Sequence, residues 1–243
     1  MYTKDFEVRY AELGHNGSVP VWTLQNYAQQ VAAEDAKRLS FGWEDFSATG
    51  IGWVLIKMQF KLLKEISNIE KLTLKTWHVC SDRLKSRRDF IITDEKGEEI
   101  AKAVSWWVII DLQKRKITRT PESLITKSET KLITSMEEIS AQNPDLTGKN
   151  PVKQCEIVSR LEDIDVNGHV NNTHFTAWAL EGMPADIRNS KKLENLLVNF
   201  KNEVKENEKI IVKTYSFESG AFWHFLVRES DNKEIASAYS VWK

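Results

Sequence analysis

Apolar side chains recur every three or four residues between Val21 and Leu39, with Gln, Glu and Lys between them. This spacing is typical of a helix that buries one face. The apolar positions are Leu24, Tyr27, Ala28, Val31 and Ala32. The pattern predicts one long helix near the start of the chain.

Short runs of β-branched and aromatic residues follow Gly50, and segments rich in Lys, Glu, Asn and Gly separate them. Such runs predict strands joined by turns. The four predicted strands cover residues 51–62, 72–79, 87–93 and 100–110. One long helix followed by a meander of antiparallel strands is an α+β pattern, in which the sheet curls around the helix.

The same order of elements returns in the second half of the chain. A turn-rich segment from residue 161 leads into a second predicted helix, and predicted strands follow at residues 196–204, 210–218, 222–228 and 234–242. The apolar face of this helix holds Phe175, Trp178, Ala179 and Met183. The repeated order indicates two copies of one unit.

Residue matches between the halves support a duplication. Glu12 aligns with Asp163, and residues 16–19 align with 167–170, both segments reading Asn-Gly-x-Val. Further along, residues 72–77 align with 210–215, and residues 99–101 align with 234–236. We therefore expect an N-terminal domain at residues 1–128 and a C-terminal domain at 151–243. The polar segment 129–150 between them is predicted to be a linker with one helical turn at 136–139.

The composition is typical of a soluble globular protein. The chain has 243 residues, of which 41% are hydrophobic and 28% charged, and its net charge of −1 argues against a dedicated nucleic-acid-binding domain. Cys80 and Cys155 lie far apart without a Cys-x-x-Cys spacing, so we expect neither a zinc site nor a disulfide framework, and a cytoplasmic protein. The N-terminus lacks a signal-peptide core, and no apolar run approaches the ~20 residues that span a bilayer.

Chemistry is expected where the two copies differ, because a duplicated unit needs only one working site. The turn before the second helix carries Asp165, Asn167 and His169. The first half has glycine, asparagine and serine at the aligned positions 14, 16 and 18. Two of the three polar groups are therefore absent from the first copy, which indicates that it kept the scaffold and lost the reactive groups.

These side chains favour acyl transfer with water as the nucleophile. A histidine exchanges protons near neutral pH, and a neighbouring aspartate fixes its tautomer. An asparagine amide donates to a carbonyl oxygen, and backbone N–H groups at a helix start stabilise a developing oxyanion. No serine or cysteine is evident as a covalent attacker.

Two alternative interpretations apply to this segment. A turn before a helix also needs Asn and Gly, so Asn167-Gly168 fits a purely structural turn. His169 and His174 lie close enough in sequence to be imagined as metal ligands, but no third ligand is spaced to match, so no metal site is predicted. His174 is assigned a surface or core position instead.

Residues 161–175 resemble the active-site motif of the fatty acyl-ACP thioesterases, the plant-type enzymes and their bacterial relatives. The resemblance extends to residues 53–55, 87–90 and 103–108, and so covers nearly the whole chain. It implies a double hotdog fold, in which an antiparallel sheet wraps each long helix. It also implies hydrolysis of fatty acyl-ACP in fatty acid biosynthesis, with no cofactor.

The resemblance also implies the site residues. Asp165, Asn167 and His169 match the family's catalytic Asp, Asn and His, and Glu203 matches its catalytic glutamate. In the plant enzymes a cysteine follows that glutamate, whereas this chain has Val204, which favours attack by water. We expect Glu203 with His169 to activate the water, while Asp165 orients its neighbours.

The oxyanion needs hydrogen-bond donors of its own. We expect the Asn167 amide to be one donor and a backbone N–H near Val170 or Asn171 to be the other.

By the same resemblance, the acyl chain is read in the first domain. The candidate substrate-binding residues are Trp53, Leu55, Met58 and Phe46. Core packing explains most of the nine tryptophans and ten phenylalanines of the chain, and the rest are available to line an acyl tunnel.

Acyl carrier proteins are acidic, so a docking surface for one is expected to be basic. Arg83, Lys85, Arg87 and Arg88 form one candidate cluster, and four basic residues between positions 114 and 119 form another. A solvated sheet edge is the alternative interpretation of either cluster.

Two other functions stay open at this point. One is an acyl-CoA thioesterase of the same fold, and the other is a non-catalytic acyl-binding module. Self-association as a homodimer also stays open, because a double hotdog contains internally the pairing that single-hotdog proteins obtain by dimerising.

Overall fold

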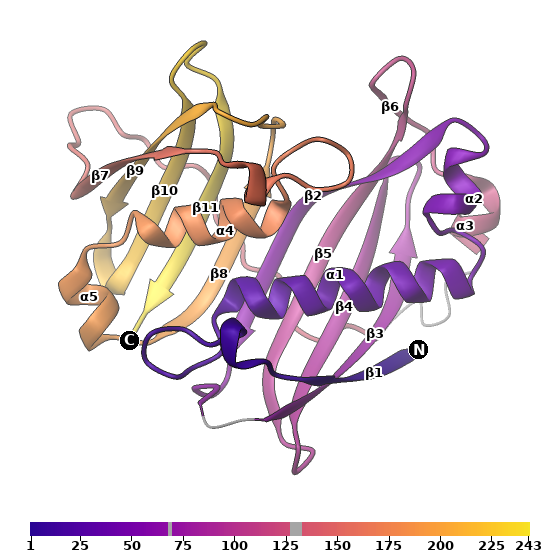
Figure 1. The fold of residues 1–243 in the computed structure, drawn as a ribbon, viewed down its shortest axis with the longest axis horizontal. Helices are drawn as coiled ribbons and strands as arrows, with labels where there is room; N and C mark the ends of the chain where they lie inside the picture. Colours follow the sequence, from indigo (N-terminus) through magenta and orange to yellow (C-terminus); the bar gives the residue numbers. More distant parts are fainter. Residues whose placement is uncertain (68–69, 127–132) are drawn as a thin grey trace. The chain divides into compact units, whose positions relative to one another are not determined.

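The computed structural model describes residues 1–67, 70–126 and 133–243 (Figure 1). Its contacts divide the chain into two compact units, Met1–Glu138 and Ile139–Lys243. Residues 129–132 of the predicted linker lie outside the described residues. Within the described ranges, no helix combines the length and the apolar character needed to cross a membrane.

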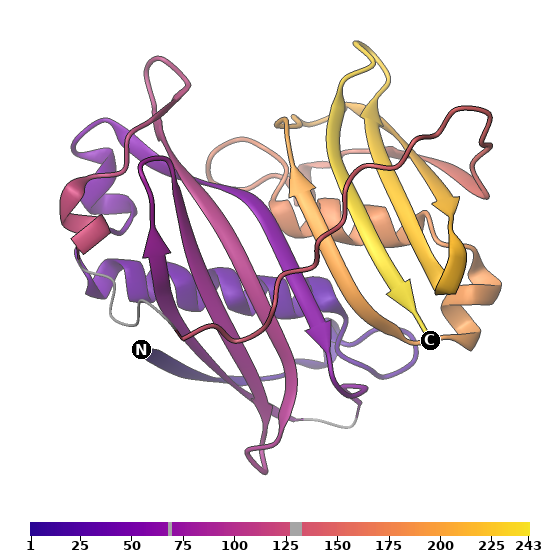
Figure 2. The same ribbon diagram turned by 180° about the vertical axis from the view of Figure 1, so that it is seen from behind.

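The first unit combines one long helix, α1 (Val21–Arg38), with an antiparallel sheet in the strand order β1-β3-β4-β5-β2 (Figures 1 and 2). The strands are β1 (Tyr2–Glu7), β2 (Ile51–Leu62), β3 (Lys71–Ser81), β4 (Lys85–Asp94), β5 (Glu99–Asp111) and the short β6 (Lys116–Thr118), which pairs with β5. Short helices are η1 (Tyr10–Glu12), α2 (Trp43–Ser47) and α3 (Glu122–Thr126). The predicted helix and the four predicted strands of this half are confirmed.

Both apolar and charged contacts hold α1 against its sheet. Leu24, Ala28 and Val31 are fully buried, as the helical spacing predicts. Asp35 is also buried, and its carboxylate lies 2.6 Å from the Arg88 guanidinium of β4. A buried carboxylate needs such a partner, because an unpaired charge is costly to remove from water. The pair therefore ties the last turns of α1 to the middle of the sheet.

The second unit repeats this plan with a shorter helix, α4 (Asn172–Glu181), which contacts β10 and β11 of a sheet in the order β8-β11-β10-β9-β7. The strands are β7 (Lys153–Val158), β8 (Leu193–Phe200), β9 (Lys209–Ser216), β10 (Ala221–Arg228) and β11 (Glu234–Trp242). Short helices are η2 (Leu161–Asp163), α5 (Ala185–Ser190) and η3 (Glu218–Gly220). Together the two units confirm the predicted α+β class.

Gly182 lets the end of α4 approach β9 closely. A Cβ at this position would lie 2.6 Å from Thr214 Oγ1 and 2.8 Å from Val212 Cγ1. Both distances are far below ordinary van der Waals contact, so any larger residue would push the helix away from the strand.

A row of polar side chains is buried across three strands of the second unit. His224 Nδ1 lies 2.9 Å from Thr214 Oγ1, and His224 Nε2 lies 2.8 Å from Ser240 Oγ. Trp242 Nε1 donates to the same Ser240 hydroxyl at 3.0 Å. At the aligned positions of the first unit, Trp107 Nε1 donates to Ser105 Oγ at 2.7 Å. The two units therefore share details of packing as well as the order of their elements.

The predicted helical turn at residues 136–139 is wrong, because hydrogen bonds to the first sheet hold this part of the chain instead. The Glu138 carboxylate accepts from Lys57 Nζ and from Trp106 Nε1, each at 3.0 Å. The Ser135 N–H donates to the Asp89 carboxylate at 2.6 Å. Burial opposes ionisation of Glu138, but the hydrogen bonds from Lys57 and Trp106 still hold the pKa of its carboxyl below the ordinary value.

Two further differences between the prediction and the structure concern strands. The strand predicted at 196–204 ends at Phe200 as β8, so Glu203 lies in the loop that follows it. The edge strands β1 and β7, which pair with β3 and β9, were not predicted.

Candidate active site

The turn before α4 closes on itself through backbone hydrogen bonds. The Asp165 N–H donates to the His169 carbonyl at 2.8 Å, and the Gly168 N–H donates to the Asp165 carbonyl at 3.0 Å. Gly168 has a φ of +76°, a left-handed conformation that glycine adopts without steric cost. The turn therefore presents residues 165–169 as one compact loop.

Two pairs of predicted site residues meet at this loop. The Asp165 carboxylate accepts from the Asn167 N–H at 2.8 Å and from the Asn167 side-chain amide at 3.3 Å. His169 Nε2 lies 3.0 Å from Glu203 Oε2. The Val170 N–H donates to the Val204 carbonyl at 2.8 Å, which brings the loop after β8 beside His169.

Exposure differs between the partners of the His169–Glu203 pair. The His169 side chain is 21% exposed and the Glu203 side chain is 48% exposed. The imidazole is thus mostly covered, while the carboxylate stays accessible to water. Such a pair is able to take a proton from water and pass it on.

The first unit builds the same loop without the same side chains. The Gly14 N–H donates to the Ser18 carbonyl at 2.8 Å, the Gly17 N–H donates to the Gly14 carbonyl at 2.9 Å, and Gly17 has a φ of +73°. The Asn16 side-chain oxygen accepts from the Ser18 N–H at 3.1 Å and from its hydroxyl at 2.6 Å. In this unit the Asn-Gly pair serves the turn itself. Aligning residues 72–77 with 210–215 also places Glu65 on Glu203, a match that the sequence comparison missed.

The expected oxyanion donors need a correction. The Val170 N–H is bonded to the Val204 carbonyl, and the Asn171 N–H donates to the Asp163 carbonyl at 2.9 Å. Neither group is available to a substrate. The Asn171 side chain caps α4 by accepting from the Thr173 N–H at 3.0 Å. The first amide of the helix, that of Asn172, has no acceptor in the described ranges and is the remaining helix-start donor.

A second histidine and carboxylate lie beside the loop, and sequence reasoning gave them no role. His174 Nδ1 is 3.0 Å from Asp163 Oδ1. The sequence feature that could have pointed to Asp163 is its alignment with Glu12, because both copies have an acid at this position.

The four predicted acyl-binding residues are packed inside the first unit. Phe46 and Trp53 stack at 5.3 Å between ring centroids, and Trp53 Nε1 donates to the Phe41 carbonyl at 2.9 Å. Leu55 and Met58 are almost fully buried on β2. Phe46 and Trp53 therefore share one apolar cluster, whereas Leu55 and Met58 are placed further along the strand.

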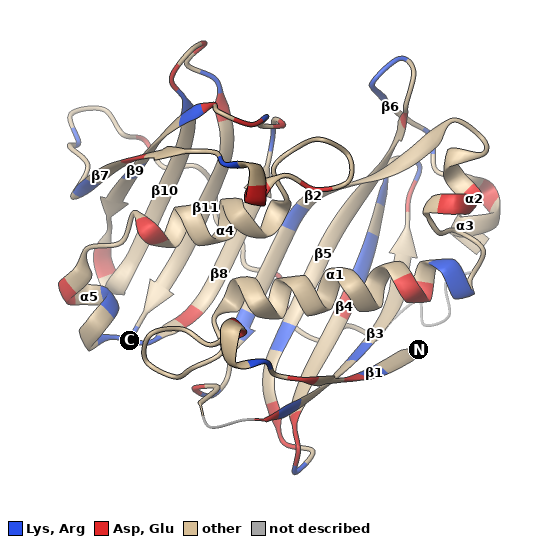
Figure 3. Ribbon diagram, viewed as in Figure 1, with Lys and Arg blue, Asp and Glu red and all other residues tan. Residues whose placement is uncertain are grey.

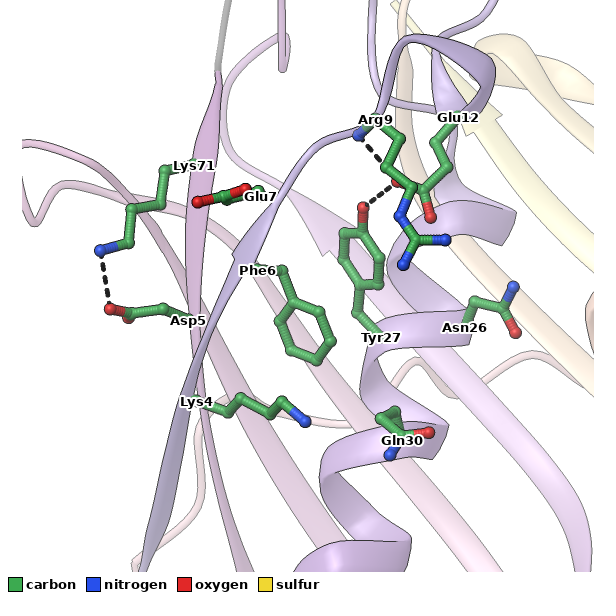
Figure 4. A pocket seen from close by; sticks show the side chains of 10 residues that line it. All are labelled: Lys4, Asp5, Phe6, Glu7, Arg9, Glu12, Asn26, Tyr27, Gln30 and Lys71. Carbon is green, nitrogen blue, oxygen red and sulfur yellow. Dashed lines mark hydrogen bonds and ion pairs between the residues drawn. The ribbon is translucent and has the colours of Figure 1, made fainter.

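A cavity of about 710 Å³ lies elsewhere in the first unit, between β1 and α1 (Figure 4). Its lining is largely polar and includes Arg9, Glu12 and Tyr27. The Tyr27 hydroxyl donates to the Glu12 carboxylate at 2.6 Å. Among the described residues that line it are none of the predicted catalytic or acyl-binding residues.

Two of the predicted docking residues are committed to the protein itself. Arg88 is buried against Asp35, as described above. The Arg87 side chain is only 11% exposed, and it contacts the carboxylates of Asp89 at 2.7 Å and Glu138 at 3.2 Å. Both guanidiniums are therefore engaged by carboxylates of the first unit, which leaves Arg83 and Lys85 as the docking candidates of this cluster.

Arg83 is exposed in the turn between β3 and β4, and Lys85 is exposed at the first residue of β4. The Arg83 carbonyl accepts from the Thr120 N–H at 3.0 Å, so this turn lies beside the chain that leaves β6. The second basic cluster is exposed at residues 114–116 and 119, and Figure 3 shows blue basic residues on the β5–β6 hairpin. The exposed parts of both clusters thus lie on neighbouring turns of the first unit.

The two cysteines are unsuited to nucleophilic attack. Both are free, and burial raises the pKa of the Cys155 thiol and of the Cys80 thiol above the ordinary value. A protonated thiol is a poor nucleophile. Among the described residues no group of three or more His, Cys, Asp or Glu side chains is arranged to hold a metal ion.

Family models match nearly the whole chain. The model of the acyl-ACP thioesterase N-terminal domain matches residues 1–127, and that of the C-terminal domain matches residues 148–243. The chain belongs to the acyl-ACP thioesterase family. This confirms the resemblance drawn from residues 161–175.

Curated relatives of the family come from plants. A chloroplastic acyl-ACP hydrolase of Cuphea viscosissima is 25% identical over 258 residues, which cover 100% of this chain and 63% of the relative. A chloroplastic palmitoyl-ACP thioesterase of Cuphea hookeriana is also 25% identical, over 100% of this chain and 62% of the relative. The chain therefore spans less than two thirds of the length of these relatives.

Solved structures of acyl-ACP thioesterases share the fold. One from Bacteroides thetaiotaomicron has a TM-score of 0.89 at 21% identity, with 100% of this chain and 97% of that chain covered. The 12:0-ACP thioesterase from Umbellularia californica has a TM-score of 0.85 at 20% identity, covering 100% and 96%. The predicted double hotdog fold of this family member is confirmed.

Proposed function

We propose that this family member hydrolyses the thioester bond of fatty acyl-ACP and releases a free fatty acid in fatty acid biosynthesis. The observation that carries the proposal is the placement of Asp165, Asn167, His169 and Glu203 around one loop of the second unit. Membership of the acyl-ACP thioesterase family supports the reaction and the carrier.

The reaction begins with the His169–Glu203 pair. The exposed Glu203 carboxylate accepts a proton from a water molecule, assisted by His169 at 3.0 Å. The water oxygen then bonds to the thioester carbonyl carbon, and the carbon–sulfur bond breaks. The proton taken from water passes through the pair to the leaving thiolate, so the products are a carboxylic acid and the thiol of the carrier.

The carbonyl oxygen gains negative charge during attack and needs donors aimed at it. We propose the Asn167 side-chain amide, oriented by Asp165, as the first donor. The Asn172 N–H at the start of α4 is the second, and the helix dipole adds to its effect.

The remaining roles fall to the first unit. We propose that residues 1–128 hold the acyl chain near Phe46, Trp53, Leu55 and Met58, because these apolar side chains pack in the interior around α2 and β2. The acidic carrier docks on the exposed basic turn that carries Arg83 and Lys85, and residues 151–243 carry the chemistry. The free thiols of both cysteines support a reducing compartment, for which we propose the cytoplasm.

The decisive experiment measures thiol release from acyl-ACP of several chain lengths, with acyl-CoA as the comparison. We expect hydrolysis of acyl-ACP at a higher kcat/KM than of acyl-CoA. A reversed preference would identify an acyl-CoA thioesterase, and tight acyl binding without thiol release would identify a binding module.

Matched variants in the two units test the assigned residues. Glu203→Gln and His169→Ala should each lower kcat by about 100-fold or more, the range typical of general acid–base groups. Glu65→Gln and Ser18→Ala change the aligned positions of the first unit and should stay within twofold of the wild type. If the second-unit variants also stayed within twofold, the mechanism would be abandoned.

A further inference from the structure

The pair formed by Asp163 and His174 is a second contact between histidine and carboxylate beside the reactive loop. His174 lies in the first turn of α4, and its Nδ1 is 3.0 Å from Asp163 Oδ1. Asp163 is buried at the end of η2, while His174 is about one third exposed. The pair therefore joins the segment before the loop to the helix after it.

Asp163 holds three parts of the chain together. Its second carboxylate oxygen accepts from the Arg160 N–H at 2.7 Å, which closes η2. Its carbonyl accepts from the N–H of Asn171, the residue that caps α4, at 2.9 Å. His174 contacts the first carboxylate oxygen. Asp163 therefore precedes the loop at residues 164–171 and also contacts the residues at the end of that loop.

We call this link between the segment before the loop and the helix after it the tie. The first unit contains a similar tie, built from other side chains. Glu12 aligns with Asp163, and its carboxylate accepts from the Arg9 N–H at 2.8 Å. The same carboxylate accepts from the Tyr27 hydroxyl of α1 at 2.6 Å. In both units an acid at the end of the short helix thus contacts its own turn and the helix that follows the loop, α1 or α4.

This recurrence indicates what the tie does. The first unit lacks the reactive residues at positions 14 and 18 but keeps the acid and a bond to the helix, which Tyr27 supplies from a position that does not align with His174. The tie is therefore a property of the loop and not a part of the chemistry. A misplacement of reacting groups by about 1 Å costs on the order of 100-fold in rate, so in the second unit the same tie bears on catalysis.

We propose that Asp163 and His174 are positioning residues, which fix the loop so that Asn167 and His169 face the substrate in one geometry. The inference rests on the proposed function for its kinetic effect. His174 acts through Asp163 and the start of α4, and transfers no proton to or from the substrate.

The experiment compares three variants in the full chain with acyl-ACP as substrate. His174→Ala removes the bond to Asp163 and should lower kcat by on the order of 10- to 100-fold, with KM within twofold. His174→Asn places an amide nitrogen near the position of Nδ1 and should recover most of the lost kcat. Tyr27→Phe removes the matching bond of the first unit and should leave kcat within twofold of the wild type.

A second measurement does not depend on activity. Amide hydrogen exchange of the peptide that contains residues 164–174 should be faster in His174→Ala than in the wild type, and restored in His174→Asn. Failure of the wild type to hydrolyse any acyl thioester would refute the proposed function, while the exchange data would still test the tie.

Three results would overturn the positioning role. One is a His174→Ala variant with unchanged kcat and unchanged exchange. Another is a His174→Asn variant as inactive as His174→Ala, because that would assign proton transfer to His174 itself. The third is an equal loss of kcat in Tyr27→Phe, since the effect would then reflect general stability.

Discussion

Lowering the pH from 8 to 5 should destabilise the native protein through one buried histidine, His224. Its imidazole is fully buried between the hydroxyls of Thr214 and Ser240. Both hydroxyls are able to donate or accept, so they satisfy the two nitrogens of a neutral ring. Because burial disfavours the charged form, it lowers the pKa of His224 from 6.5 to about 3.

The sign follows from the protons bound in each state. Between pH 6.5 and pH 3 the unfolded chain carries a proton on His224 that the native protein excludes. Stability from this group is complete above pH 6.5 and is lost as the pH falls. At pH 5 the unfolded histidine is 1.5 pH units below its pKa of 6.5, and at about 1.4 kcal/mol per unit the loss is about 2 kcal/mol.

The assay is urea unfolding at pH 8 and pH 5, followed by tryptophan fluorescence. Other groups also titrate in this range, so the quantity to compare is the change in unfolding free energy between the two pH values. His224→Gln retains an amide for the two hydroxyls, and should lose about 2 kcal/mol less than the wild type on acidification. His15→Gln removes an exposed histidine and should lose as much as the wild type.

An equal loss in the wild type and in His224→Gln would refute this reasoning. It would mean that His224 is protonated in the native state, or that the unfolded chain does not gain its proton.

The remaining predictions concern packing and docking. Gly182→Ala should destabilise the protein by about 1–3 kcal/mol, measured by the thermal midpoint, because its Cβ would overlap β9. Glu138→Ala should cost about 1–3 kcal/mol in urea unfolding, since it leaves the partly buried donors of Lys57 and Trp106 without their acceptor. Glu137→Ala at the exposed neighbouring position should cost less than about 0.5 kcal/mol, as a surface substitution does. The double variant Arg83→Glu with Lys85→Glu should raise KM for acyl-ACP on the order of tenfold at low salt, with a smaller effect at about 1 M salt, and an unchanged KM would exclude docking there.

The strands with long apolar runs were predictable from the sequence, and those with alternating short patterns were not. The run at 51–62 and the run at 234–242 agree with β2 and β11 to the residue. β1 and β7 alternate half-buried and exposed positions over six residues each, so their sequences resemble polar linkers. They form strands because the edges of β3 and β9 supply hydrogen-bond partners.

Burial of charge was also outside the reach of sequence reasoning. Arg87 and Arg88 belong to a basic run that reads as solvated surface. Asp89 is a local partner of Arg87, but Asp35 and Glu138 lie about 50 residues from the arginines that they contact and meet them only in the folded unit. The same contacts to Glu138 hold the end of this unit against the sheet without a helical turn, although its sequence favours one.

Among the proposed site residues, the sequence alone selects those that differ between the two copies. Comparison of the two turns selects Asp165 and His169, because the first copy lacks them. It passes over Glu203, whose counterpart Glu65 is also a glutamate, and over Asp163, whose counterpart Glu12 is also an acid. A contrast between repeats is blind to groups that both repeats keep, so these residues became visible only through family resemblance or through geometry.

The same main-chain bonds and a left-handed glycine hold the turn in both units, and side-chain bonds that differ between the units, from Asn16 in one and Asp165 in the other, add to them. The backbone of the turn is therefore independent of the reactive side chains that it carries. In such a tandem protein, substitutions within the existing turn are enough to gain or lose reactive side chains, without an insertion or a change of backbone. If the proposed mechanism holds, the first repeat keeps this backbone without the aspartate and the histidine of the second.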